Sequence, residues 1–258
     1  MHLHFLSVDQ RLHECAFEFF KDAPVGAISR NRILLAGWIY HDLSIEGAVF
    51  RNGELKKGLC GLEGQNWLEN QLIDRVAGMA RAIEYVVEYA GCTAPFDLEF
   101  VKTVHRTLRE AGDSRSGKYR KDDPPNSVYR HDSSPVGSIS YRMRLLSEML
   151  SEKSVLHPIQ YACSVHRQLM ETFPFDGENA VVARLVMNAC LLRSGYPPCV
   201  FSISDRQQYF STYLGKESRF IDLVVRAMLQ VIEGQKRENT ISATVPWAHE
   251  TVGALGGV

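Results

Sequence analysis

The sequence predicts an all-α fold, a bundle of helices around one central helix that is buried on every side. Between residues 180 and 192 only Arg184 and Asn188 are not apolar. A helix that is apolar all round is enclosed by its own domain, and this one is too short to span a bilayer. Further segments with helical periodicity precede and follow it, and glycine or proline ends most of them.

The composition is that of an ordinary soluble globular protein. The chain has 258 residues, of which 45% are hydrophobic and 23% charged, and its net charge is −1. This near-neutral charge gives no reason to expect a nucleic-acid partner. The six cysteines show no metal-ligand spacing, so we expect reduced packing residues. The first residues lack a long apolar core, so we expect no signal peptide and no membrane partner. We expect a cytoplasmic location, unless a specialised secretion system delivers the protein.

Three regions are expected along the chain. Residues 1–27 form an N-terminal extension, residues 28–235 form the main domain, and residues 236–258 form a flexible tail. The tail is predicted because its sequence is polar at first and then rich in glycine.

Four segments make up the first part of the main domain. Helical periodicity runs through 28–44, and Gly47 is a plausible terminator of that helix. The polar, glycine-rich stretch 51–66 predicts a loop. Two helices are then expected at 67–91 and 96–111, and a glycine closes each of them.

A polar stretch at 113–135 separates these helices from the rest of the bundle. Two short strand candidates, 118–121 and 127–130, flank the turn-forming sequence DDPPN and indicate a small β-hairpin. A solvated surface loop is the alternative. The remaining helices are expected at 136–152, 157–172, 203–214 and 217–234.

The central helix follows a tight turn, FPFDGEN, at residues 173–179. Pro174, Asp176 and Gly177 are turn formers. Within the helix, Arg184 and Asn188 lie four residues apart and therefore on one face. An unpaired buried charge is costly, so Arg184 needs either a protein carboxylate or an anionic ligand.

This segment resembles the motif of the Fic (fido) family, H-P-F-x-[D/E]-G-N-G-R-x-x-R, a loop that leads into a central helix. Pro174, Phe175, Asn179 and Arg184 match the motif at unchanged spacing. Most characterised members of that family transfer AMP from ATP to a protein hydroxyl. The resemblance covers roughly residues 28–235 and implies an all-α Fic fold with a small β-hairpin flap.

Five positions depart from the motif. Phe173 stands at the position of the catalytic histidine, and Gly177 at the position of the metal-binding acid. Glu178 and Ala180 replace the two motif glycines, and Val181 replaces the first arginine. Phenylalanine cannot accept a proton, so no catalytic residue is assigned.

These departures also weaken the expected nucleotide site. Glu178 is a poor substitute for the acid, because a shift of one residue at a helix start turns the side chain by about 100°. We therefore expect no metal and no cofactor; ATP and Mg²⁺ are expected only if activity survives. The remaining candidates for binding a nucleotide or another anion are Asn179, Arg184 and Gly177.

A second element of the sequence is similar to the family's inhibitory helix, whose signature is [S/T]-x-x-x-E-[G/N]. The residues are Ser44-Ile45-Glu46-Gly47, with Asp42 at the Ser/Thr position. In the family this glutamate pairs with the second arginine of the motif. The resemblance therefore implies that Glu46 pairs with Arg184, and it marks Glu46 and Gly47 as inhibitory-type residues.

Three residues of the predicted hairpin, Lys118, Tyr119 and Arg120, match a G-x-Y-R segment that opens the family's flap over the active site. In the family this flap holds the target segment by strand addition. His105 and His166 also resemble family histidines, and we expect both to be packed structural residues.

The function expected from these observations is that of a degenerate Fic-like protein. The chain would lack AMP transfer and act by binding a protein partner or as a regulatory pseudoenzyme. The alternative is a Fic-family transferase with altered chemistry, moving AMP or another phosphate-linked group onto a protein hydroxyl. A third reading is an unrelated helical interaction domain that matches the motif by chance.

Overall fold

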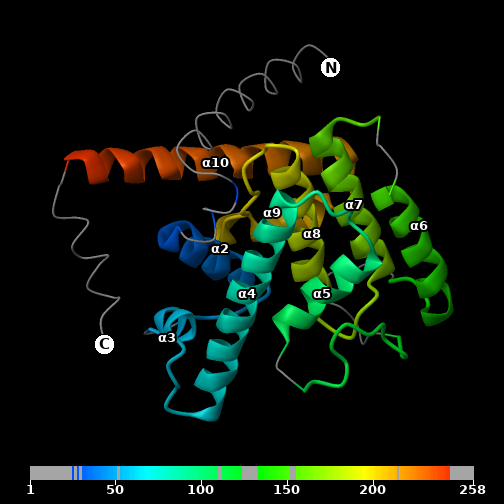
Figure 1. The fold of residues 1–258 in the computed structure, drawn as a ribbon, viewed down its shortest axis with the longest axis horizontal. Coiled ribbons are helices and arrows are strands. Elements are labelled where there is room, and N and C mark those ends of the chain that lie inside the picture. Colours follow the sequence, from blue (N-terminus) through cyan, green and yellow to red (C-terminus); the bar gives the residue numbers. More distant parts are fainter. Residues whose placement is uncertain are drawn as a thin grey trace.

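The computed structural model describes Val25, Ile28 and six stretches of the chain, and it confirms the all-α class. The stretches are 31–50, 53–109, 112–123, 133–151, 155–213 and 215–244. Their helices, shown in Figure 1, are α2 (Arg32–Ile45), α3 (Glu54–Cys60), α4 (Trp67–Gly91), α5 (Leu98–Leu108), α6 (Ile139–Ser151), α7 (Pro158–Thr172), α8 (Asn179–Arg193), α9 (Arg206–Thr212) and α10 (Glu217–Thr244). Two 3₁₀ turns, η2 (Val136–Ser138) and η3 (Ile203–Asp205), precede α6 and α9.

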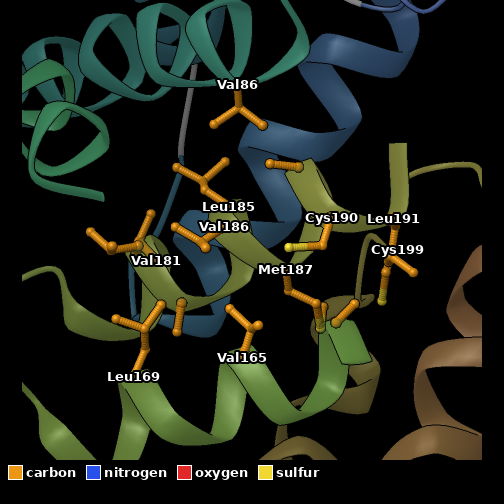
Figure 2. Packing of buried hydrophobic residues seen from close by; sticks show 14 of the residues in the cluster. Val86, Val165, Leu169, Val181, Leu185, Val186, Met187, Cys190, Leu191 and Cys199 are labelled. Atoms are coloured by element: carbon orange, nitrogen blue, oxygen red, sulfur yellow. The ribbon is translucent and has the colours of Figure 1, made fainter. Parts of the chain in front are cut away.

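Helix α8 is the centre of the bundle, as the sequence predicts. Every residue from Asn179 to Leu192 is buried. Its main neighbours are α7 and α4. Figure 2 shows Val86 of α4 on one side of α8, and Val165 and Leu169 of α7 on the opposite side. Burial on all sides explains why the helix carries no polar stripe.

Local side-chain caps fix where several helices begin. The Asn31 side chain accepts hydrogen bonds from the amides of Ile33 and Leu34 at the start of α2. Asn66 caps α4 and Asp97 caps α5 in the same way, by accepting a bond from an amide of the first turn. The start of α2 therefore lies four residues later than the periodicity alone suggests.

Helix α3 lies inside the stretch 51–66, for which the sequence predicts a loop. That prediction is wrong for Glu54–Cys60. The helix packs on α4 at Gly58, where an added Cβ would lie 2.5 Å from the Val76 side chain. Gly58 is thus a glycine that allows two helices to pack closely. A high glycine content predicts a loop equally well in both cases, so it cannot distinguish a loop glycine from a packing glycine.

The predicted hairpin is only partly within the described residues. No strand occurs in the described part of the chain, and Tyr119 instead forms a single antiparallel bridge with Phe175 of the α7–α8 loop. The second strand candidate, 127–130, lies outside the described residues, so its pairing stays a prediction. The segment around Tyr119 is extended as expected, and the partner that the structure describes for it is the central loop.

The last described helix extends into the region for which the sequence predicts a flexible tail. Helix α10 packs on α7 and α9 and continues to Thr244, beyond residue 236, where the sequence predicts a flexible tail (Figure 1). Residues 1–24 and 245–258 lie outside the described residues. Among the described helices none combines the length and the apolar character needed to cross a membrane.

Candidate functional site

The candidate site is the loop between α7 and α8, which carries most of the motif residues. Phe173 closes α7 with φ 49°, and Glu178 opens α8 with φ 58°. Both lie in the left-handed region, and they are the two non-glycine residues with positive φ in the described part of the chain. An L-residue pays roughly 1–2 kcal/mol for that conformation. The Fic motif has glycine at position 178, which such a backbone favours.

Asn179 holds this loop together from within. Its side-chain oxygen accepts a hydrogen bond from the Phe175 amide at 2.8 Å, and its side-chain nitrogen donates to the Phe175 carbonyl at 2.9 Å. The Phe175 ring in turn stacks on His105, with 4.1 Å between ring centroids. The side-chain amide of Asn179 is therefore engaged within the loop, and its role in binding a nucleotide or another anion stays a prediction.

Arg120, from the predicted flap, attaches to the same loop. Its Nε donates to the Phe173 carbonyl at 2.8 Å, and its guanidinium also donates to the carbonyls of Asp122 and Ser134. Its backbone amide donates to the Pro174 carbonyl at 2.9 Å. Arg120 is buried, and its hydrogen bonds connect the predicted flap with the loop between α7 and α8. The flap residue Lys118 is exposed by contrast.

The position of the catalytic base offers no proton acceptor. Phe173 is half-buried and packs against the core. The two nearby histidines are both fully buried, as expected for structural residues. Burial, reinforced by Arg109, lowers the pKa of His105 to about 4, and burial with Arg184 lowers that of His166 to about 3. The Nδ1 atom of His105 accepts a bond from the Gly117 amide, and Nε2 of His166 lies 2.9 Å from the Tyr209 hydroxyl.

A cation lies beside the position of the metal-binding acid. A Cβ built on Gly177 would lie 3.4 Å from Nη1 of Arg109. The Arg109 guanidinium is itself paired with Asp113, and Arg115 pairs with Asp176 at 3.3 Å. A divalent metal needs oxygen ligands at this point, and the chain supplies a glycine with a guanidinium next to it. Position 177 itself therefore offers no ligand to Mg²⁺ and has a cation beside it.

Arg184 is the most strongly held polar residue of the site. Its side chain is 1% exposed, and its Nε donates to Oδ1 of Asp42 at 2.9 Å. Its Nη2 donates to the same Asp42 oxygen and, at 2.8 Å, to Oε1 of Glu46. The Nη1 atom lies 3.3 Å from the Tyr209 hydroxyl. The contact between Glu46 and Arg184 implied by the family resemblance is present in this structure.

Asp42 is the partner that sequence reasoning missed. It stands where the inhibitory signature has Ser or Thr, so it counted as a departure from a motif. A signal was nevertheless available, because Asp42 lies four residues before Glu46 and therefore on the same face of α2. Burial raises the pKa of Asp42, and the adjacent Arg184 opposes that rise. Gly47, with φ 89°, ends α2 directly after this pair.

Glu178 is a carboxylate at the mouth of the site. It is half-buried, and burial raises its pKa. The positive charge of Arg75 opposes this rise, and the negative charge of Glu46 adds to it. Glu178 occupies the N-cap position of α8, and no side chain caps that helix. Its negative charge thus lies at the helix N-terminus, where the motif has a glycine that would leave the amides open to an anion.

Comparisons with known proteins agree with this geometry. Residues 95–191 match the Fic/DOC family. The chain is 27% identical over 244 residues to a protein adenylyltransferase Fic from Nematostella vectensis, and the match covers 88% of this chain and 55% of that one. A protein adenylyltransferase Fic from Drosophila melanogaster is 27% identical over 180 residues, which cover 67% and 35%. The chain therefore spans about half the length, or less, of these relatives.

Solved structures show the same fold. Fic-1 from C. elegans superimposes with a TM-score of 0.74 at 21% identity, covering 90% of this chain and 72% of that one. A Fic-domain-containing signaling protein from Bacteroides thetaiotaomicron gives 0.70 at 17% identity, covering 89% and 96%. The chain thus has the all-α fold of these Fic structures. Its residues 95–191 are similar to the Fic/DOC family, with five departures from the Fic motif in the loop and central helix.

Proposed function

We propose that this chain is a Fic-fold protein without AMP-transfer activity, and that it acts by binding a protein partner as a regulatory pseudoenzyme. The observation that carries the proposal is the state of Arg184. This arginine would have to contact a nucleotide phosphate, yet Asp42 and Glu46 occupy its Nε and Nη2 donors in a buried site. A phosphate would have to displace two carboxylates at once, and each would then lack its buried partner.

Two further features support the same conclusion. Phe173 offers no atom that could accept the proton of an attacking hydroxyl. Arg109 stands beside Gly177, so the place of the metal-binding acid is already next to a positive charge. In this proposal three separate features prevent transfer: the base is absent, the metal ligand is absent, and the arginine is already paired. Reversing one of them leaves the other two.

The partner-binding part of the proposal is supported by the flap. Arg120 fixes the segment around Tyr119 to the central loop, while Lys118 stays exposed at its edge. A segment that is already ordered loses little entropy when a partner binds. In this fold such a segment can add a strand to an extended peptide.

Labelled ATP and mass spectrometry test the loss of transfer. The parent protein and Phe173→His are incubated with ATP and Mg²⁺, alone and with a captured partner, and then searched for an added AMP. Neither protein should give an adduct, because the histidine restores only one of the three lost features. An AMP adduct on Ser, Thr or Tyr with the parent would overturn the proposal. An adduct with the Phe173→His variant alone would show that the phosphate site is intact.

One observation favours a second candidate, a transferase with altered chemistry. Glu178 keeps a strained backbone conformation and a raised pKa at the mouth of the site. Backbone strain of this kind tends to persist at functional positions. In this candidate Glu178 accepts the proton of a protein hydroxyl as its oxygen bonds to the phosphorus of a phosphate-linked donor. The bond from that phosphorus to the rest of the donor breaks, and the rest of the donor leaves with the bonding electrons. Any such transfer should then be lost in Glu178→Gln and kept in Glu171→Gln, an exposed glutamate on α7.

A further inference from the structure

A polar cleft lies outside the motif, and Arg109, whose Nη1 approaches Gly177, is one of the residues that line it. Its volume is about 600 Å³, and it lies between α4, the end of α5 and the loop at 112–116. Three arginines line it, Arg81, Arg106 and Arg109, together with Thr107, Ser116 and a single carboxylate, Asp74. Among the described residues the lining thus includes three arginines and one carboxylate, in a chain whose overall net charge is close to zero.

The three arginines differ in how firmly protein carboxylates hold them. Arg81 is exposed on α4 and makes no ion pair among the described residues. Arg106 pairs with Glu99, whose side chain is 63% exposed and does not line the cleft. Exposed pairs of this kind are worth little and are readily exchanged for another anion. Arg109 pairs with Asp113 through Nε and Nη2, and its Nη1 is directed to the Gly177 side.

The chemistry of these donors selects the ligand. A guanidinium is planar and donates two parallel hydrogen bonds to a phosphate or carboxylate. A group with more than one negative charge can accept hydrogen bonds from more than one arginine of the same cleft at once. We propose that this cleft is an anion site that binds a phosphoryl group, supplied by a phosphorylated side chain of a partner or by a small phosphorylated compound. The two sources share the same recognition chemistry.

The cleft does not depend on the state of Arg184. Arg81 and Arg106 lie on α4 and α5, away from the pairs that Arg184 makes with α2. Binding here therefore needs neither Mg²⁺ nor an opened motif. The inference also stands if the proposed loss of AMP transfer is wrong, because substitutions at Arg81 leave the motif residues unchanged.

Calorimetric titration with pyrophosphate, in EDTA and at low salt, tests the proposal. Three variants accompany the parent protein. Arg81→Ala removes the arginine that lacks an ion pair among the described residues, and Asp74→Ala removes the lining carboxylate. Arg219→Ala removes an exposed arginine on α10 and serves as the matched control. We expect Arg81→Ala to weaken binding at least about tenfold, Asp74→Ala to tighten it, and Arg219→Ala to bind like the parent.

The outcomes decide the question in both directions. Absence of binding by the parent at millimolar pyrophosphate would overturn the proposal, and so would equal binding by the parent and Arg81→Ala. Tighter binding by Asp74→Ala cannot come from a general loss of structure, so it keeps the test valid if Arg81→Ala folds poorly. A phosphoserine peptide, its unphosphorylated form and inorganic phosphate are then compared on the parent. Tighter binding of the phosphopeptide than of inorganic phosphate assigns the site to a protein partner, and the reverse order assigns it to a small compound.

Discussion

At the scale of single residues, two carboxylates hold Arg184, those of Asp42 and Glu46. Arg184 meets Asp42 through two nitrogens and Glu46 through one, and Tyr209 approaches its third nitrogen. The Asp42 side chain is 6% exposed, whereas that of Glu46 is 17% exposed. The deeper carboxylate makes more of the bonds, so it should contribute more to the stability of the pair.

Substitution of the two carboxylates should therefore give unequal losses. Asp42→Ala should lower the free energy of unfolding by about 3–5 kcal/mol, because it leaves Arg184 buried with one weaker partner. Glu46→Ala should cost about 1.5 kcal/mol, the value of one charge-assisted hydrogen bond. Urea denaturation of both variants measures the order. Equal losses, or a larger loss for Glu46→Ala, would contradict the assignment of Asp42 as the main partner.

The losses of stability caused by substituting Arg184 and Asp42 should also be strongly non-additive. Arg184→Ala and Asp42→Ala are each expected to be severe, and the double variant should lose clearly less than their sum, because no unpaired charge remains between these two residues. Additive losses within about 0.5 kcal/mol would show that the two side chains act independently.

Glu178 gives a second test at this scale, because its backbone and its charge can be separated. Glu178→Gly relieves the left-handed strain and removes the carboxylate, whereas Glu178→Ala removes only the carboxylate. We expect Glu178→Gly to be more stable than Glu178→Ala by about 1 kcal/mol, measured by thermal denaturation. If the alanine variant is as stable as the glycine variant, the positive φ costs nothing here.

At the scale of elements, the segment around Arg120 is fastened to the central loop by carbonyl groups that the guanidinium satisfies. Arg120→Lys should cost about 3 kcal/mol, because an ammonium cannot reach the carbonyls of Phe173, Asp122 and Ser134 together. The Arg120 amide, which donates to Pro174, should also exchange its hydrogen faster in the lysine variant. Lys118→Ala, two residues away and exposed, should change neither quantity. Unchanged exchange at the substituted position would show that the loop holds the segment without the guanidinium.

Sequence patterns predicted the elements whose signal is local. The apolar run of α8, the extended segment at Tyr119 and the facing of Glu46 and Arg184 could be expected from spacing or from the family motif. Helix α3 could not be predicted in this way. Its Gly58 is typical of a loop in the sequence, and only the structure shows that it packs against Val76. Arg109 was missed for a related reason, since its approach to Gly177 depends on how α5 packs beside the loop. Contacts between segments far apart in the chain produce no periodic pattern in the sequence from which they could be predicted.

At the scale of the whole molecule, two buried histidines make stability depend on pH. The folded-state pKa of His105, about 4, lies below the ordinary value of 6.5, and that of His166 lies lower still. The unfolded chain therefore binds protons that the folded chain does not, as the pH falls below about 6.5. Stability should be complete above that pH and decline toward pH 4, by on the order of 3 kcal/mol for His105 alone.

A variant isolates this contribution from the carboxylates that titrate in the same range. His105→Asn keeps an acceptor for the Gly117 amide and cannot titrate. The stability difference between parent and variant, measured by urea denaturation, should shift in favour of the variant between pH 7 and pH 4. A difference that stays constant with pH would show that His105 is protonated in the folded state as readily as in the unfolded one.

The central claim is that the motif no longer receives a nucleotide, because Arg184 is permanently occupied and the metal-binding acid is gone. Isothermal titration of the parent protein with ATP and Mg²⁺ tests it most directly, with an active Fic-family adenylyltransferase as positive control and Glu46→Ala as a second sample. The same titration on Arg81→Ala shows how much of any heat comes from the cleft, so that the remaining heat reports on the motif. We expect no remaining heat from the parent and none from Glu46→Ala, since Asp42 still holds Arg184. Micromolar binding by the parent, or binding that appears only in Glu46→Ala, would contradict the account and restore a nucleotide switch to this site.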